Sequence, residues 1–215
     1  MDAPSDRTTV KRHHDRAVYE RDRIRAILDE ALFCHVGVVV DGAPRVIPTI
    51  HARIDDTLYI HGSNASRTLR ALKDGAEACI EVTLLDALVL ARSAFAHSMN
   101  YRSVVVYGTL REVTDRDEKW EAQRALVDHV IHGRAADARM PHERELRQTT
   151  IMAVPLEEAS AKVRSGPPID DPADLDLPIW AGELPLRLLP GEPVGDPLLP
   201  PDVEAPDYVR RYRRG

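Results

Sequence analysis

Small, hydroxylated and basic residues gather where a strand-like segment of the sequence ends. In YIHGSNASRTLRAL, a strand runs into Gly62 and Ser63, and the following turn opens a helix at Ser66 and Arg67. Backbone N–H groups at a helix start, two hydroxyls and a guanidinium together suit an anion the size of phosphate. An ordinary capped helix with a surface arginine has the same residues. The pattern therefore predicts either an anion site or a plain helix cap.

A second polar cluster lies between two strongly apolar segments, within AHSMNYRSVVVYGTL. Its members are His97, Ser98, Asn100, Tyr101, Arg102 and Ser103. A bland hairpin loop needs about two to five residues, and this cluster has no glycine or proline to form a tight turn. We therefore predict a polar surface that contacts a ligand or partner, with a plain loop as the alternative.

The motifs of several enzyme classes are absent: GxSxG, GxGxxG, GxxxxGK[ST] and HExxH do not occur. His129 and His132 lie three residues apart on a predicted helix, a spacing that metals can use. No third ligand lies nearby in the sequence, and an exposed amphipathic helix explains the pair better. We expect no metal site.

The composition predicts a single folded unit. The chain has 215 residues, of which 43% are hydrophobic and 30% charged. A chain of this length buries roughly 70% of its unfolded surface, which is enough for a core without disulfides. Its net charge of -6 gives no general attraction to nucleic acid or to anionic membranes, so we expect neither as a partner.

Both cysteines, Cys34 and Cys79, lie in apolar runs and are expected to act as small core residues. No CxxC motif is present, which suits a reducing compartment. No apolar run approaches the roughly 20 residues that a bilayer requires, and the first 30 residues are charged. We therefore expect a cytoplasmic protein without a membrane span or signal peptide.

Periodicity predicts strands with helices around them. A helix is expected over 17–31, followed by an antiparallel meander of FCHVGVVV, RVIPTIHARI and LYIHGS, with a hairpin at Asp41-Gly42. A short helix ending at Gly75 comes next. Two long β segments, an amphipathic helix ending at Gly133, a helix over 141–148 and the strand TIMAVPLEEASAKVR complete the pattern.

Because strands outnumber helices, we expect a mainly β protein (α+β) with about six antiparallel strands in a barrel-like sheet and peripheral helices. Residues 1–16 are expected to be a flexible arm and 17–166 the folded domain. Eleven of the 16 prolines lie in 167–215, which predicts an irregular extension, partly docked around Trp180.

The order of four segments resembles one protein family. PRVIPTIHARIDDTLYIHGSNASR, VLARSAFAHSMNYRSVVVYGT, EEASAKVRSGPP and IWAG are similar to the pyridoxamine 5'-phosphate oxidase-like, FMN-binding split-barrel proteins, in the branch that includes the nitroimidazole reductases. The resemblance covers roughly residues 20–185. It implies a six-stranded split barrel and a homodimer that holds FMN in two clefts between its subunits. A counterpart of the C-terminal basic motif of true pyridoxamine 5'-phosphate oxidases is not evident, so vitamin B6 oxidation is not expected.

The resemblance also implies cofactor-binding residues. Ile47, Pro48 and Thr49 would lie along the flavin ring, with His61 and Gly62 on the next strand and Ser63, Ser66 and Arg67 at the phosphate. The remaining expected contacts are Asn100, Tyr101, Arg102 and Ser103, together with Lys162, Arg164 and Trp180 in a late stretch that contacts or covers the ring. Arg102 or Lys162 would stabilise the anionic reduced ring, and His61 would donate a proton or only position the cofactor.

The function implied is that of an FMN-dependent oxidoreductase. It would take electrons from NADH or NADPH and pass them to a small acceptor such as a nitroaromatic compound. A non-catalytic protein of the same fold that stores or senses flavin, a deazaflavin or heme is the alternative. A cofactor-free interaction protein is a third class, in which both polar clusters would be structural only.

Overall fold

Two antiparallel sheets form the framework of the computed structural model, which describes residues 2–213. The strands are β1 (Ala17–Val18), β2 (Cys34–Val40), β3 (Ala43–Thr49), β4 (His51–Ile54), β5 (Thr57–Ser63), β6 (Glu77–Leu90), β7 (Ser98–Thr109), β8 (Arg111–Glu112), β9 (Thr149–Pro155), β10 (Ala159–Arg164) and β11 (Gly182–Pro185). The helices are α1 (Arg21–Glu30), α2 (Arg67–Lys73), α3 (Arg116–Val130), α4 (Arg134–Asp137), α5 (Glu143–Gln148) and α6 (Asp207–Arg210).

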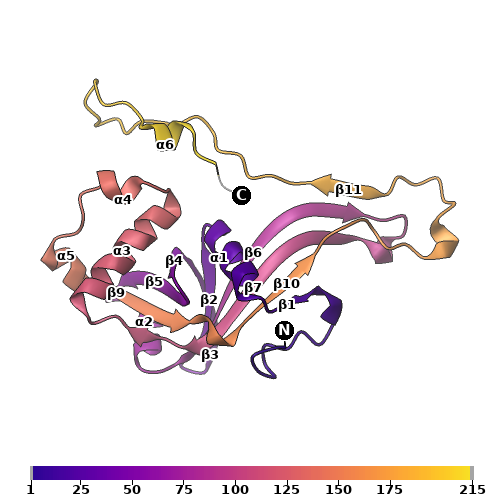
Figure 1. The fold of residues 1–215 in the computed structure, drawn as a ribbon, viewed down its shortest axis with the longest axis horizontal. Helices are drawn as coiled ribbons and strands as arrows, with labels where there is room; N and C mark the ends of the chain where they lie inside the picture. The colour runs from indigo at the N-terminus through magenta and orange to yellow at the C-terminus, as the bar shows by residue number, and fades with distance from the viewer. Residues whose placement is uncertain (1, 214–215) are drawn as a thin grey trace.

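The larger sheet has the order β1-β10-β7-β6-β2-β3, with β11 added to β6, and the smaller has the order β4-β5-β9-β8. Helices α3, α4 and α5 gather at one end of the sheets, and α6 lies on the C-terminal tail, away from both sheets (Figure 1). The mainly β, antiparallel split-barrel architecture is therefore confirmed. The expected count of six strands is too low, partly because two predicted strands each divide between the sheets.

The divisions lie at Ile50 and at residues 156–158. The predicted strand RVIPTIHARI becomes β3 in the larger sheet and β4 in the smaller sheet. The predicted strand TIMAVPLEEASAKVR becomes β9 and β10, separated by a 3₁₀ turn over Leu156–Glu158. Pro155 has no N–H to continue a ladder, and the next N–H, of Leu156, donates instead to the Asp56 carbonyl at 2.8 Å. The chain thus passes between the two sheets at these points, and residues of both sheets pack in the main core cluster.

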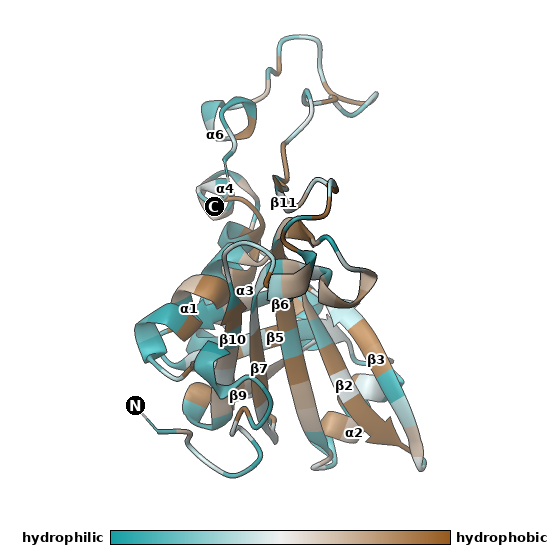
Figure 2. Cartoon of the chain, turned by 90° about the vertical axis from the view of Figure 1, so that its right-hand side faces the viewer, coloured by the Kyte–Doolittle hydropathy of each residue, from teal (hydrophilic) through white to brown (hydrophobic). Residues whose placement is uncertain are grey.

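Alternation along β2 shows how the core forms. Cys34, Val36, Val38 and Val40 are buried, whereas Val39 between them is 60% exposed. Brown, apolar segments follow β2 and β6 in Figure 2. Burial raises the pKa of the Cys34 thiol to about 12, so this cysteine is an inert core residue, as predicted.

Helix α1 covers this core with the apolar stripe that the sequence predicts. Ile24, Ile27 and Leu28 are at most 3% exposed and pack in the main core cluster. The helix is shorter than the expected 17–31, because Ala17 and Val18 pair with β10 as strand β1.

The two ends of the chain lie against the barrel at defined points. In the arm, Thr8 is 2% exposed and the Arg7 guanidinium donates to Glu158 at 3.0 Å. Strands β6 and β7 continue beyond the barrel as a curved ribbon, along which β11 runs (Figure 1). The carboxylate of Asp170 pairs with Arg92 at 2.9 Å and holds the start of the extension. Trp180 is 67% exposed, so β11 and Asp170 dock the segment more than this ring does.

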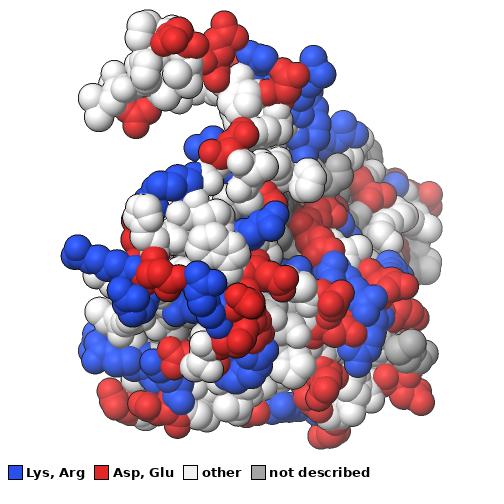
Figure 3. All heavy atoms as spheres, turned by 60° about the vertical axis from the view of Figure 1, so that its left-hand side comes forward, with Lys and Arg blue, Asp and Glu red and all other residues white. Residues whose placement is uncertain are grey.

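Cationic and anionic side chains are interspersed over the face drawn in Figure 3, without a large area of one sign. No described helix combines the length and the apolar character needed to cross a membrane.

Candidate functional site

A cavity of about 210 Å³ lies between the end of β3, the end of β5 and the start of α2. Its lining contains seven residues that the resemblance implied as flavin contacts: Ile47, Pro48, Thr49, His61, Gly62, Ser63 and Ser66. The lining also includes Val36, Ile60, Thr68 and Leu69, which the sequence analysis did not identify. Val36 and Ile60 look like ordinary core positions in the alternating pattern, so only the fold shows that they close this cavity.

Strand ends bring these residues together. The Thr49 hydroxyl lies 3.5 Å from the His61 carbonyl, so β3 and β5 meet at the cavity even though they belong to different sheets. Strand β5 is held from its other side by β9, with His61 paired to Ile151. The cavity therefore lies at the junction of the two sheets.

Gly62 lets the chain pass closely over α2. A Cβ atom at this position would lie 2.8 Å from Leu69 Cδ1, closer than real Cβ contacts. Any side chain here would displace Leu69, which is 6% exposed and part of the core. The glycine therefore lets β5 pass close to Leu69 without displacing it.

His61 lines the cavity, and one of its ring nitrogens is unsatisfied among the described residues. Its Nδ1 is buried and has no hydrogen-bond partner in the described part of the chain. Burial lowers the pKa of this imidazole, so the neutral form prevails at neutral pH. Because buried polar atoms nearly always have partners, Nδ1 is suited to a polar group of a bound ligand. The cavity therefore fits a ligand that is apolar along one edge and carries hydrogen-bonding atoms along another.

The predicted anion-binding residues flank the cavity. Ser66 is the N-cap of α2, and its hydroxyl oxygen accepts the N–H of Leu69 at 3.3 Å. The Ser63 hydroxyl oxygen likewise accepts the N–H of Ala65 at 3.2 Å. Arg67 is the first residue of α2 and is exposed, next to the cavity-lining Ser66 and Thr68 but not itself part of the lining. Both predictions for this segment therefore remain open: the helix is capped, and the cavity lining includes two serines, with Arg67 next to one of them in the sequence.

Arg102 lies elsewhere, in an ion-pair network. Its guanidinium donates to both oxygens of Asp86, at 2.8 and 3.0 Å, and to both oxygens of Glu30. These carboxylates raise the pKa of Arg102 further above its usual value. Within one chain the network joins α1, β6 and β7, and it directs the positive charge at carboxylates rather than at the cavity.

Asn100 and Arg164 form a second structural network. Arg164 is 6% exposed and donates to Asn100 Oδ1 and to the carbonyls of Gly166 and Pro167, the latter two at 2.9 and 3.0 Å. The Asn100 amide in turn donates to the Glu183 carboxylate of β11. This network ties the chain extension to β7.

The other expected flavin contacts do not line the cavity either. Tyr101, Ser103 and Lys162 are partly exposed and lie on paired strands, with Ser103 opposite Lys162. The exposed Trp180 ring packs over Gly182. Their part in cofactor binding stays a prediction, and within one chain only the β3, β5 and α2 residues converge.

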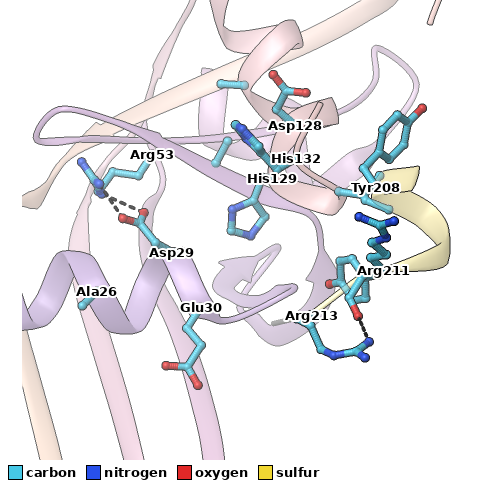
Figure 4. Close-up of a pocket in the computed structure, with 14 residues that line it drawn as sticks. Ala26, Asp29, Glu30, Arg53, Asp128, His129, His132, Tyr208, Arg211 and Arg213 are labelled. Carbon is cyan, nitrogen blue, oxygen red and sulfur yellow. Dashed lines mark hydrogen bonds and ion pairs between the residues drawn. The ribbon is translucent and has the colours of Figure 1, made fainter. Parts of the chain in front are cut away.

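A second cavity, of about 860 Å³, lies between α1, β4, α3 and the C-terminal tail (Figure 4). Its lining residues are Ala26, Asp29, Glu30, Ala52, Arg53, Ala125, Asp128, His129, Ile131, His132, Tyr208, Arg211, Tyr212 and Arg213. The sequence analysis noted the two histidines and the basic C-terminus but did not relate them, because 77 residues lie between His132 and Arg210 and no shared motif joins them. No described residues form a group of three or more His, Cys, Asp or Glu side chains able to hold a bare metal ion.

A family model and several solved structures match this chain. The family model described as pyridoxamine 5'-phosphate oxidase matches residues 20–163. The flavocytochrome Anf3 from Azotobacter vinelandii is 41% identical, covers all of both chains and superposes with a TM-score of 0.93. The FAD and heme binding protein from Mycobacterium smegmatis is 36% identical, with 91% of this chain and 96% of that chain covered and a TM-score of 0.86.

A more distant structure supports the fold alone. A putative 5-nitroimidazole antibiotic resistance protein from Bacteroides thetaiotaomicron is 24% identical, with 68% of this chain and 86% of that chain covered and a TM-score of 0.59. No curated protein matches the chain in sequence.

Proposed function

The chain belongs to the pyridoxamine 5'-phosphate oxidase family, and from that premise we propose that it binds a flavin nucleotide in the cavity between β3, β5 and α2. The observation that supports this proposal most is the convergence of seven implied flavin contacts on one cavity. The unpartnered Nδ1 of His61 adds a polar atom suited to a flavin ring atom. The names of two relatives, a flavocytochrome and an FAD and heme binding protein, agree with a flavin.

The flavin nucleotide is either FMN or FAD. The family resemblance led us to expect FMN, whereas the relative that is 36% identical is named for FAD. We propose FAD, because this relative matches the chain over 91% of its length. Ser63, Ser66 and Arg67 would contact a flavin phosphate in either case, since both nucleotides carry one beside the ribityl chain.

A bound flavin supplies hydride and single-electron transfer, and the protein supplies position and electrostatics. The backbone and hydroxyl of Thr49 and the neutral His61 imidazole would hydrogen-bond the ring edge. Because the pKa of His61 is lowered, its Nδ1 either accepts a hydrogen bond or holds one proton, according to the tautomer. We infer an oxidoreductase that uses NADH or NADPH and a small acceptor such as a nitroaromatic compound.

We also propose that two copies of the chain form the complete site. Ligand pockets usually occupy about 300–1,000 Å³, more than the 210 Å³ enclosed by one chain. Ile47 lines the cavity and is 45% exposed, whereas Val39 and Val46, at 60% and 64%, expose apolar side chains on the opposite face of β2 and β3. Strand β3 is the edge of the larger sheet, and a second copy packed at this edge would cover Ile47 and enlarge the cleft. Tyr101, Ser103, Lys162 and Trp180 would then act on the partner's flavin.

A second candidate function is heme binding, alone or beside flavin. The two relatives described above at 41% and 36% identity have names that include a cytochrome or heme. The larger cavity, with His129 and His132 in its lining, offers the imidazoles that heme iron uses.

Released cofactor tests these functions directly. The protein is purified without added cofactor and denatured, and the supernatant is separated by chromatography against FMN, FAD and heme standards. We expect FAD, and size-exclusion chromatography with light scattering should give a dimer. Flavin-loaded protein is then assayed for NADH and NADPH oxidation with a nitroaromatic acceptor. Bound flavin without turnover would favour the storage or sensing alternative over an oxidoreductase.

A further inference from the structure

We propose that the C-terminal tail, residues 187–213, is a hinged lid over the 860 Å³ cavity and is held shut by the side chain of Tyr208. Such a lid governs how a ligand enters and leaves the cavity. This inference goes beyond the proposed cofactors, because it concerns access to the cavity and holds for any occupant. The lid has two parts: a strap, residues 187–206, and a docked end, residues 207–213.

The strap runs outside the sheets without support from them. The chain follows β6 up to Leu186, whose N–H donates to the Asp86 carbonyl at 2.9 Å. Every residue over 187–204 is exposed, and within the described chain the hydrogen bonds of the strap join only tail residues. In Figures 1 and 2 this part of the tail runs clear of both sheets. The strap can therefore swing without breaking a described hydrogen bond to the barrel.

The composition of the strap suits a stiff connector that turns at few points. Six of its 20 residues are proline, each of which restricts φ and favours an extended chain. Near the start of the strap, Gly191 has open space around it, with no atom within 4 Å of the position of a Cβ. Glycine adopts backbone conformations that are closed to other residues. A turn at Gly191 therefore swings the rest of the strap and the docked end together.

Tyr208 joins the docked end to the start of α4. Its hydroxyl donates to the Asp137 carboxylate at 2.7 Å and accepts from the Arg134 guanidinium at 3.2 Å. Its ring covers Gly133, where a Cβ atom would lie 3.6 Å from Tyr208 Cδ1. Among residues 2–213, no other residue of the lid forms a hydrogen bond or ion pair with the chain outside the tail. Tyr208 is therefore the latch of the lid.

The turn that receives Tyr208 is itself held in place. Helix α3 ends at Val130, and Gly133 adopts a left-handed conformation with φ 91° before α4 begins. The Asp128 carboxylate accepts the N–H of Ala135 at 2.8 Å, and Ala135 is 6% exposed. The latch thus joins a loosely held tail to a well-packed part of the domain, so opening moves the tail and leaves the turn in place.

The docked end supplies one wall of the cavity. Tyr208, Arg211, Tyr212 and Arg213 line it from the tail, and the other lining residues belong to α1, β4, α3 and the turn after α3. Figure 4 shows the labelled tail residues on one side of this space and the histidines of the α3 side on another. Release of Tyr208 removes the tail wall and exposes the α3 wall, including Ala125, to solvent.

The reactivity of a thiol inside the cavity tests the lid in the full-length protein. Ala125→Cys places a thiol in the lining, and Ala94→Cys places one at the exposed far end of the β6–β7 ribbon. Labelling by N-ethylmaleimide is followed by peptide mass spectrometry, which separates these thiols from Cys34 and Cys79. Adding Tyr208→Phe should speed labelling at position 125 at least tenfold and leave position 94 unchanged. A tenfold rise corresponds to a shift of about 1.4 kcal/mol in the opening equilibrium.

Tyr212→Phe is the matched control, because it removes a second tail hydroxyl from the lining that has no hydrogen bond among residues 2–213. It should leave both labelling rates within twofold, whereas Tyr208→Ala, which also removes the ring, should exceed Tyr208→Phe. Equal rates at position 125 with and without the Tyr208 hydroxyl and ring would overturn the lid. So would labelling of Ala125→Cys as fast as Ala94→Cys with the latch intact, or a parallel rise at both positions, which would indicate general loosening.

Discussion

The rings of His51 and His129 are in contact, with their centroids 4.5 Å apart and their planes inclined by 50°. His51 is fully buried on β4, and its neighbour across the sheet, Ile60, lines the smaller cavity. His129 lines the larger cavity. The pair therefore lies between the two cavities, with one ring on the side of each.

His51→Phe tests how much the buried His51 imidazole contributes to the free energy of unfolding. His51 Nε2 donates to the Leu28 carbonyl at 2.9 Å, and phenylalanine would leave that carbonyl without this bond. We expect the free energy of unfolding to fall by about 1–3 kcal/mol, measured by urea titration. His14→Phe, at an exposed position of the arm, should change it by less than about 0.5 kcal/mol. A His51→Phe protein as stable as wild type would show that the contact is dispensable.

His61 predicts a specific pH dependence. Burial holds the pKa of His61 in the folded protein below its ordinary 6.5, so the unfolded chain binds this proton more readily. The stability from the neutral imidazole is complete above about pH 6.5 and is lost as pH falls toward the lower, folded pKa. We expect the free energy of unfolding to decline from pH 7 to pH 5 less steeply in His61→Gln than in wild type. Identical slopes would contradict the buried, neutral imidazole.

Arg67→Ala tests the phosphate contact. A charge-assisted hydrogen bond lost from an exposed site should weaken flavin binding about tenfold, which fluorescence quenching of added FMN or FAD measures. Arg23→Ala, an equal change of charge on α1, is the control and should leave affinity within twofold of wild type. If both variants bind flavin as wild type does, Ser63 and Ser66 form only a helix cap and Arg67 has no part in the site.

The sequence predicts the mainly β, antiparallel architecture correctly but gives too few strands. Alternation of buried and exposed residues identifies β2, and a Ser cap with a Gly terminator identifies α2, because these signals are local. The division of one predicted strand at Ile50 is not local: β3 and β4 pair with β2 and β5 in different sheets. Nothing in the residues around Ile50 resembles a turn, so the sheet crossing is visible only in the fold.

The candidate site also divides into residues with a local sequence signal and residues placed by non-local contacts. Thr49, His61 and Ser66 converge as the family resemblance implied, because they belong to neighbouring strand ends and the following helix. Arg102 resembled a cofactor residue by type, but its partners Glu30 and Asp86 come from distant segments that only tertiary packing reveals. The larger cavity was not predictable, since its walls come from four separate elements.

The Arg102 network predicts a stability effect. Arg102→Ala removes the shared partner of Glu30 and Asp86 and leaves two partly buried carboxylates close together. We expect a loss of about 1–3 kcal/mol in the free energy of unfolding, between the values for exposed and buried pairs. Arg102→Lys should recover part of it, because an ammonium cannot bind both carboxylates in the bidentate manner. Unchanged stability in the alanine variant would show that the network is not stabilising.

The most direct test of the central claim is the visible absorption spectrum of the protein purified without added cofactor. Repeating it after saturation with FAD and removal of unbound flavin completes the measurement. The proposal predicts the absorption of an oxidised flavin at one per chain. It also predicts that Thr68→Trp, which places a large ring in the smaller cavity, binds far less flavin, whereas Thr68→Ser binds as wild type. A colourless protein that takes up neither FAD nor FMN would contradict the claim.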